Sequence, residues 1–388
     1  MVVGGGLLGL AAGRALANRG REVTVLEQAS VGHPGSGSKG SCRIFRLGYS
    51  DPDYVRGARR SRELWHALES LCYRKILFPV PQLTIGAGLA GVRDAMTAAG
   101  APTEMLSAAQ AMARFPEVRV DGPALLEPES AVTAADVAVA ALAAGVPEIR
   151  TGVRVSALAD DGRRVTLETS EGRLSARAVV LCAGPETAGL LGWAEWSAPT
   201  LEQVAYLEPA SPAGAAGEGM PIFLCHDQRI PYGLPVPGSS LYKTGLHQSG
   251  TRIRPGAPQD QSADPDLALQ LEEMAGRYLP GFGPRAVRTE RCVYDNTPDD
   301  DFVVDRIGNV VVGSGTSGHG FKFGPLLGEW LAALATGEDD LLGGDELAGL
   351  AARLRLGRLR LGRQGVGRVG VEQERREPDE LSRPAAGT

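Results

Sequence analysis

A glycine-rich turn near the N-terminus places the strongest constraint on how this chain can fold. Two valines lead into GGGLLG, in which Gly4, Gly6 and Gly9 form the pattern GxGxxG. The next stretch, LLGLAAGRALANRG, has helical periodicity, and EVTVLE then alternates like a strand ending at Glu27. The spacing predicts a βαβ unit that binds a dinucleotide, because the glycines let the backbone approach a pyrophosphate and Glu27 can accept a ribose hydrogen bond. The alternative is a glycine-rich turn in an ordinary βαβ unit.

The order of the remaining elements predicts an α/β (α+β) fold in which a Rossmann-like domain is assembled from separated segments. We expect residues 1–79, 128–198 and 301–350 to form this domain. Residues 80–127 and 199–300 are expected to form a second, β-rich domain that binds the substrate. The Arg- and Gly-rich residues 351–388 predict a disordered tail, with a basic interaction arm as the alternative.

Two helices are predicted from local patterns inside the first domain. Residues 54–71 have Leu64, Leu68 and Leu71 at helical spacing, which indicates an amphipathic helix. The alanine-rich stretch 131–146 is interpreted as one helix. The later stretch 309–337 predicts a strand, a Gly/Ser loop and a helix that has Pro325 in its first turn.

Charge and cysteine usage exclude several classes of protein. The formal net charge is −6, which argues against nucleic acid as the main partner. The five cysteines have no paired spacing, so neither a disulfide framework nor a zinc site is expected, and reduced thiols favour a cytoplasmic protein. The acidic run at residues 299–301 is interpreted as a solvated turn rather than a metal site. The sequence contains no uninterrupted apolar run of about 18 residues, so a transmembrane helix is not expected.

Cys292 is the cysteine whose surroundings need an explanation. It lies in RTERCVYDNTPDDDF, a polar stretch, whereas Cys182 lies in the apolar run AVVLCAG that is typical of a buried structural cysteine. On this neighbourhood alone, Cys292 is an ordinary, partly exposed cysteine.

Several separated motifs, taken in order, identify a family. The glycine turn, CRIFRLGY, YKTGLH, RCVYDNTPDDDF and GSGTSGHGFKF resemble the monomeric sarcosine oxidase group, which includes N-methyltryptophan oxidases, within the glycine/D-amino-acid oxidase-like flavoproteins. The resemblance covers residues 1 to about 345. It implies that the first domain binds FAD and that the flavin 8α-methyl carbon is attached to a cysteine, at the position of Cys292. A nearby cation would activate that thiol by lowering its pKa.

The resemblance also assigns roles to residues in these motifs. Lys243 would activate O2, because a fixed cation stabilises developing negative charge. Arg43 would face the flavin, and Arg46 with Lys322 would hold a substrate carboxylate. The pocket would be lined by His247, Tyr232 and Tyr294. The alternative for these three residues, without the family context, is a place in the core. The alternative for the lysines and arginines is that they are charges on the surface. The implied cofactor-binding set is Gly4, Gly6, Gly9, Glu27, Arg43, Val155, Cys292, Gly318, His319, Gly320 and Lys322; the implied catalytic set is Lys243, Arg43, His247 and Tyr232.

The implied reaction is oxidation of a carboxylate-bearing secondary amine, N-methyl or cyclic, to an imine that hydrolyses, while O2 becomes hydrogen peroxide. The expected partners are therefore a small amine and O2, with a monomeric protein. Ser38-Lys39-Gly40-Ser41-Cys42 departs from the family pattern, in which histidines and a threonine are common, so substrate choice can differ. The alternatives are an oxidase of a natural-product intermediate, a flavin-binding protein without turnover, and an NAD-dependent dehydrogenase.

Overall fold

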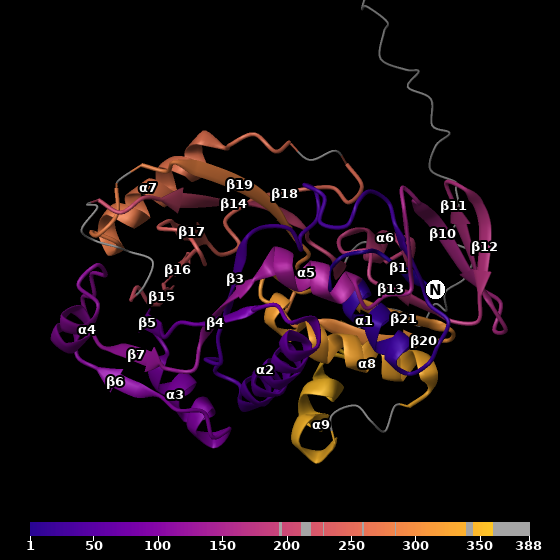
Figure 1. The fold of residues 1–388 in the computed structure, drawn as a ribbon, viewed down its shortest axis with the longest axis horizontal. Helices are drawn as coiled ribbons and strands as arrows, with labels where there is room; N and C mark the ends of the chain where they lie inside the picture. The colour runs from indigo at the N-terminus through magenta and orange to yellow at the C-terminus, as the bar shows by residue number, and fades with distance from the viewer. Residues whose placement is uncertain are drawn as a thin grey trace, which may run out of the picture.

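A six-stranded sheet contains the βαβ unit that the glycine pattern predicts. The computed structural model describes residues 1–359 except 194–195, 211–218, 228, 258–259, 284 and 339–343. The sheet has the order β20-β21-β13-β1-β2-β9, and every neighbouring pair is parallel except β20 and β21. Its strands are β1 (Val2–Val3), β2 (Thr24–Glu27), β9 (Glu148–Thr151), β13 (Val179–Leu181), β20 (Val303–Ile307) and β21 (Val310–Ser314). The short β1 lies in the middle, so strands from both halves of the chain meet around the glycine turn (Figure 1).

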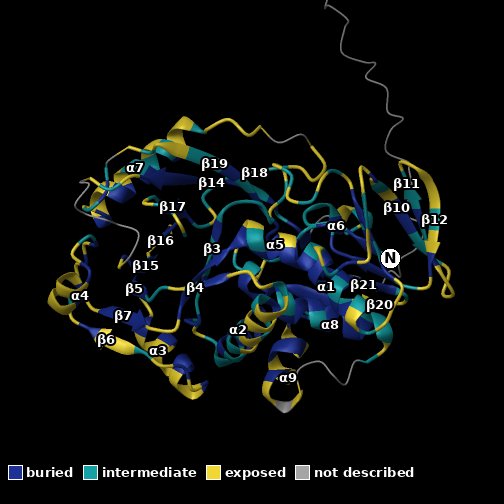
Figure 2. Ribbon diagram, in the orientation of Figure 1, coloured by how far each residue is buried: buried dark blue, intermediate teal, exposed yellow. Residues whose placement is uncertain are grey.

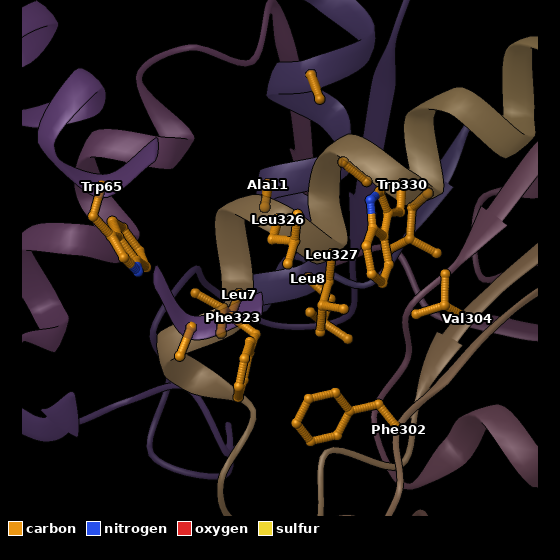
Figure 3. Packing of buried hydrophobic residues seen from close by; sticks show 14 of the residues in the cluster. Leu7, Leu8, Ala11, Trp65, Phe302, Val304, Phe323, Leu326, Leu327 and Trp330 are labelled. Carbon is orange, nitrogen blue, oxygen red and sulfur yellow. The ribbon is translucent and has the colours of Figure 1, made fainter. Parts of the chain in front are cut away.

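Two helices from opposite ends of the sequence pack together beside this sheet. They are α1 (Leu7–Asn18) and α8 (Gly324–Thr336). Figure 3 shows Leu7, Leu8 and Ala11 of α1 facing Leu326 and Leu327 of α8 within one apolar cluster. Figure 2 shows that α8 and the strands beside it are among the most buried parts of the molecule. The packing fixes the start of each helix close to the glycine turn.

The second large sheet is mostly antiparallel and contains the segments predicted for the second domain. Eight strands follow the order β18-β14-β17-β16-β15-β5-β7-β6, and β19 pairs with β14. The strands are β5 (Gln82–Gly86), β6 (Glu104–Leu106), β7 (Ala124–Glu127), β14 (Thr200–Leu207), β15 (Ile222–His226), β16 (Pro231–Pro235), β17 (Tyr242–Leu246), β18 (Thr251–Arg252) and β19 (Arg288–Tyr294). Helices α3 (Leu89–Ala98), α4 (Ala108–Arg114) and α7 (Pro265–Tyr278) accompany it. The domain boundaries given above stay a prediction.

Two three-stranded sheets and further helices complete the described fold. One sheet is β10 (Val155–Asp160), β11 (Val165–Thr169) and β12 (Gly172–Ala176); the other has the order β3 (Cys42–Phe45), β8 (Ala131–Ala134) and β4 (Leu77–Pro79). The remaining helices are α2 (Pro52–Cys72), α5 (Ala135–Ala143), α6 (Glu186–Leu190), η2 (Phe321–Phe323), α9 (Gly344–Arg353) and η4 (Leu356–Leu359). No helix in the described part of the chain is both long enough and apolar enough to cross a membrane.

Three local predictions were wrong. The stretch 131–146 is not one helix, because β8 (Ala131–Ala134) pairs with β3 and β4 before α5 begins. Leu71 does not join the buried face of α2, since it is 66% exposed whereas Leu68 is buried. Within 80–127 the strands β6 and β7 were missed, and they join the large sheet.

The disordered tail was predicted to begin at residue 351, which is too early in the sequence. Helix α9 and the turn η4 continue the fold to Leu359, and Leu350, Leu354 and Leu356 are buried. The backbone amide of Val304 donates a 2.9 Å hydrogen bond to the Leu354 carbonyl, which ties this segment to β20. The rest of the predicted tail, residues 360–388, lies outside the described residues.

Candidate active site

A cavity of about 770 Å³ lies where the glycine turn, the end of β2 and the end of β13 meet. Gly4, Gly6, Glu27 and Val155 of the predicted cofactor-binding set line it. Gly9 does not, and its role is to let α1 approach the turn, because a side chain there would overlap the Gly4 carbonyl oxygen. The remaining lining includes backbone from residues 183–185, 253–257 and 313–314.

Glu27 is buried at the end of β2 and holds the glycine turn in place. Its carboxylate accepts hydrogen bonds from the backbone amides of Gly5 at 2.7 Å and Ala29 at 2.8 Å. Ser38, from the loop that follows β2, accepts a 2.9 Å hydrogen bond from the amide of Leu7 at the start of α1. The cavity therefore has a helix N-terminus at one point and an acidic group at another, as a dinucleotide site requires.

We expect Gly4→Ala to destabilise the fold and weaken cofactor binding. Gly4 has a φ of +101°, and a side chain there would overlap the Cys182 carbonyl oxygen. The expected loss in the free energy of unfolding is about 2–3 kcal/mol. Urea unfolding of the cofactor-free protein and FAD titration measure the two effects. Gly20→Ala is the matched control, because Gly20 also has a positive φ of +69° but no atom within 4 Å; equal losses in both variants would contradict the overlap argument.

A second cavity of about 350 Å³ adjoins the first. Arg43, Tyr294, Gly318 and Phe321 line both cavities, so the two spaces meet at these residues. The second cavity contains the other predicted site residues: Arg46, Tyr232, Lys243, His247, Cys292, His319 and Lys322. Gly320 lines only the larger cavity. Residues from the two large sheets and from β3 thus converge on a single site.

Lys243 and Arg43 meet at one backbone oxygen. Lys243 is 5% exposed on β17, and its Nζ donates a 3.1 Å hydrogen bond to the Cys42 carbonyl. A guanidinium nitrogen of Arg43 donates to the same oxygen at 2.9 Å. Burial lowers the pKa of Lys243, and the positive charge of Arg43 lowers it further. The result is a fixed, desolvated lysine beside a second cation.

Cys292 lies on β19, directly opposite Glu202 of β14, and is a free thiol. Burial raises the pKa of this thiol, and the nearby charges of Arg43 and Lys243 offset part of the rise. The predicted effect of a nearby cation is present, because Arg43 and Lys243 both lower the pKa of this thiol, but burial outweighs them and the net pKa is raised. The two cations do face the thiol, as that prediction requires.

Arg46 and Lys322 both contact Tyr49. The Arg46 guanidinium carbon is 4.0 Å from the centroid of the Tyr49 ring, and Lys322 Nζ donates a 2.9 Å hydrogen bond to the Tyr49 hydroxyl. Lys322 also donates to the His319 carbonyl at 2.6 Å. Burial, and then the charge of Arg46, hold the pKa of Lys322 well below its usual range. A carboxylate placed near both cations would supply the opposite charge and favour the charged form of Lys322.

The aromatic residues and His247 form one wall of the smaller cavity. The Tyr294 hydroxyl donates to the Tyr232 hydroxyl, and the His247 and Tyr294 ring centroids are 5.6 Å apart. Burial lowers the pKa of His247 to about 4, with further contributions from Arg46 and Lys322. His247 is therefore neutral at pH 7.

Two residues at or beside the site, Tyr49 and Glu127, were not predicted from the sequence. Tyr49 contacts both Arg46 and Lys322, although it lies only three residues after Arg46 in a quoted motif. Glu127, which is 1% exposed, accepts hydrogen bonds from the Gly48 amide at 2.8 Å and from Gln82 Nε2 at 2.7 Å. Burial raises the pKa of Glu127, and the positive charge of Arg46 opposes that rise. Its position behind Arg46 depends on strand pairing between β5 and β7.

The acidic run at residues 299–301 is only partly a solvated turn. Asp301 is buried and accepts a 2.8 Å hydrogen bond from the Tyr54 hydroxyl. Its carboxylate also pairs with Arg353 at 2.6 Å. Among the described residues, no group of three or more His, Cys, Asp or Glu side chains could hold a metal ion.

Comparison with known proteins shows the family to which this chain belongs. A family model described as FAD dependent oxidoreductase (DAO) matches residues 1–334. The chain belongs to this family. It is an FAD-dependent oxidoreductase of the amine and amino-acid oxidase group, as the motifs predicted.

Relatives of this family member span nearly its whole length. Monomeric sarcosine oxidase of Bacillus sp. (strain NS-129) is 30% identical over 358 residues, covering 87% of this chain and 92% of that protein. N-methyl-L-tryptophan oxidase of Yersinia pestis (strain Pestoides F) is 29% identical over 86% of this chain and 94% of its own. The solved structure of NikD, an unusual amino acid oxidase essential for nikkomycin biosynthesis, has a TM-score of 0.78 and 26% identity, covering 89% of this chain and 95% of its own. The mixed α/β fold with a parallel and a largely antiparallel sheet agrees with these oxidases.

The residues of the larger cavity fit FAD. Gly4 and Gly6 line the cavity without side chains, Glu27 lies at the carboxyl end of β2, and the start of α1 opens onto the cavity. The smaller cavity adjoins the larger one at residues that line both, among them Arg43 and Tyr294.

Proposed function

We propose that this FAD-dependent oxidoreductase oxidises a secondary amino acid, N-methyl or cyclic, that is held by its carboxylate. The observation that carries the proposal is the pair of cations, Arg46 and Lys322, which both contact Tyr49 and line the cavity that adjoins the FAD cavity. Bound FAD would supply a two-electron acceptor. The C–H bond next to the nitrogen would lose a hydride equivalent and the nitrogen a proton, leaving a C=N bond, and O2 would take up the two electrons and two protons as hydrogen peroxide. The imine would hydrolyse to an aldehyde and an amine.

The residues of the smaller cavity would orient the substrate and control its charge. A carboxylate between Arg46 and Lys322 would be held by charge-assisted hydrogen bonds. The neutral His247 can accept a hydrogen bond from the substrate nitrogen, because its pKa of about 4 leaves the ring uncharged at pH 7. The buried wall of Tyr232 and Tyr294 would exclude water from the same space. Lys243 would stabilise negative charge developing on O2.

For the cofactor, we propose that Cys292 is the attachment point and that Arg43 holds the surrounding loop. Arg43 donates hydrogen bonds to the carbonyls of Gly37, Lys39 and Cys42. Its guanidinium also lies 5.7 Å from the centroid of the Phe321 ring. These contacts would fix a cation beside the boundary between the two cavities. A cytoplasmic location and a monomeric state remain predictions from the sequence.

Oxygen uptake by purified, FAD-loaded protein tests the proposal. The panel contains N-methyl amino acids, cyclic imino acids and amines that lack a carboxylate. Uptake with carboxylate-bearing secondary amines, and little with the others, is the expected result. A protein that consumes no oxygen with any of them does not have this function.

A second candidate is oxidation of a natural-product intermediate with the same cofactor. The observation that favours it is the similarity in structure to NikD, whose described role is in nikkomycin biosynthesis. Efficient turnover of simple N-methyl amino acids in the panel would exclude this candidate. Weak turnover of all of them, with tight binding of larger heterocyclic carboxylates, would favour it.

Arg46→Met is expected to raise the KM for carboxylate-bearing substrates about 30–100-fold, since it removes one partner of a buried charge pair. The turnover of an amine without a carboxylate should change little. Steady-state oxygen uptake over a range of substrate concentrations measures both. Arg60→Met is the control, because Arg60 is exposed on α2 and paired with Glu63. A fall in kcat with unchanged KM would contradict a role for Arg46 in binding the carboxylate.

A further inference from the structure

Arg353 of α9 lines the smaller cavity, although it lies beyond residues 1–334 that match the family model. Its guanidinium pairs with Asp51, the residue that caps α2, and with Asp301 at 2.6 Å. We call Asp51, Arg353 and Asp301 the rim bridge. All three residues line the cavity, and the Arg353 side chain is 44% exposed, so the bridge lies where the cavity meets solvent.

A row of stacked groups connects the inner cations to this rim bridge. The Arg46 guanidinium lies 4.0 Å from the Tyr49 ring centroid, and the Tyr49 and Tyr54 rings stack with centroids 5.1 Å apart and an interplanar angle of 21°. The Arg353 guanidinium then lies 5.6 Å from the Tyr54 ring centroid. A ligand whose carboxylate is bound at Arg46 therefore has an aromatic wall beside it, and this wall ends at Arg353.

The segment that carries Arg353 is held firmly at this place. Leu350 and Leu354 are 1% and 0% exposed, and Leu350 packs against α2 at Gly57. Arg355 pairs with Asp305 at 2.8 Å, and Arg358 pairs with Asp299 at 2.7 Å. Arg355 and Arg358 do not line the cavity. Arg353 is thus the arginine of this segment that a ligand inside the cavity can meet.

We propose that Arg353 is a specificity-determining residue, which limits how large a group a carboxylate ligand can carry along the wall of Tyr49 and Tyr54. The inference rests on the proposed carboxylate site at Arg46 and Lys322. Shortening Arg353 opens the rim bridge and extends the aromatic wall to solvent, so larger aromatic carboxylates gain room and contact area. Small carboxylates, which do not reach the rim, are unaffected.

The test measures binding of acetate, benzoate and 1-naphthoate to FAD-loaded protein from the change in flavin absorbance, which requires no turnover. In Arg353→Ala, the affinity for 1-naphthoate should rise about tenfold relative to acetate, a difference of about 1.4 kcal/mol. Arg355→Ala, which removes the ion pair with Asp305, should behave like the wild type, because neither residue lines the cavity. Asp51→Asn keeps a capping side chain on α2 and frees one end of Arg353, so it should shift the preference in the same direction by less.

The outcomes separate this proposal from the proposed function. An unchanged ratio of the affinities for 1-naphthoate and acetate in Arg353→Ala and Asp51→Asn, which includes an equal change for all three carboxylates, overturns the size limit while leaving the carboxylate site in place. If Arg353→Ala does not fold, the same readings are taken from Asp51→Asn alone. If none of the carboxylates alters the flavin absorbance of the wild type, the carboxylate site itself is overturned, and the size limit with it.

Discussion

Replacing Lys243 by methionine is expected to slow the reaction of the substrate-reduced protein with O2 about 10²–10³-fold, the cost of removing one fixed group that stabilises developing charge. Lys243 is 5% exposed and held by the Cys42 carbonyl, so its cation needs no reorganisation when charge develops nearby. The anaerobic half of the reaction, in which substrate bleaches the flavin, should change far less. Stopped-flow absorbance in air and under nitrogen measures the two halves separately.

The dependence of this O2 reaction on pH provides an internal check. Burial and Arg43 lower the pKa of Lys243, so its charge is lost at a lower pH than that of an ordinary lysine. Because the charged form is the useful one, the wild-type rate should fall as the pH rises through that pKa, whereas Lys243→Met should show no such fall. Lys75→Met, at an exposed lysine, should match the wild type. Equal slowing of both halves of the reaction would assign Lys243 a general structural role instead.

Cys292→Ser is expected to convert a protein that keeps its flavin after acid denaturation into one that releases all of it. Cys292 and Cys42 both line the smaller cavity, so either thiol has access to a ligand there. Cys42→Ser is therefore the decisive control, and it should keep the flavin attached. Absorbance of the acid supernatant and pellet measures the bound fraction. Free flavin from the wild type would leave Cys292 without this role, and release only from Cys42→Ser would move the attachment to Cys42.

The raised pKa of the Cys292 thiol adds a prediction about the rate of attachment. The thiolate is the reactive form, and burial makes it scarce at neutral pH despite Arg43 and Lys243. Attachment of FAD to cofactor-free protein should therefore be slow at pH 7 and faster at higher pH. Samples denatured in acid at intervals after mixing would give this rate directly.

The sequence predicted the βαβ unit correctly because its signals are local. The turn, helix α1 and the end of β2 at Glu27 depend on glycine stereochemistry and on spacing within about 27 residues. The family and FAD as cofactor followed from motifs that the family comparison confirms. The individual site roles, including those of Lys243 and Cys292, stay predictions that the experiments above address.

The errors occurred where tertiary contacts outweigh local preference. Residues Ala131–Ala134 are alanine-rich, yet they form β8 because β3 and β4 supply pairing partners on both sides. The segment at residues 351–359 was predicted to be disordered because it is rich in arginine and glycine. Leu350 and Leu354, four residues apart on one helical face, were the signal that it packs against the domain. Tyr49 and Glu127 were missed because their roles come from where β3 and β7 place them.

The central position of β1 has a consequence for how the molecule is made. Val2 and Val3 are the middle strand of the FAD-domain sheet, but their neighbour β13 follows about 180 residues later, and β21 closes the sheet only after residue 310. On the ribosome, the glycine turn therefore emerges well before β13 and β21 are synthesised. Such distant pairings make folding slow and leave strand edges unpaired in the nascent chain. Chaperones that hold the growing chain, and free FAD that binds the completed turn, would then govern how much active protein a cell obtains.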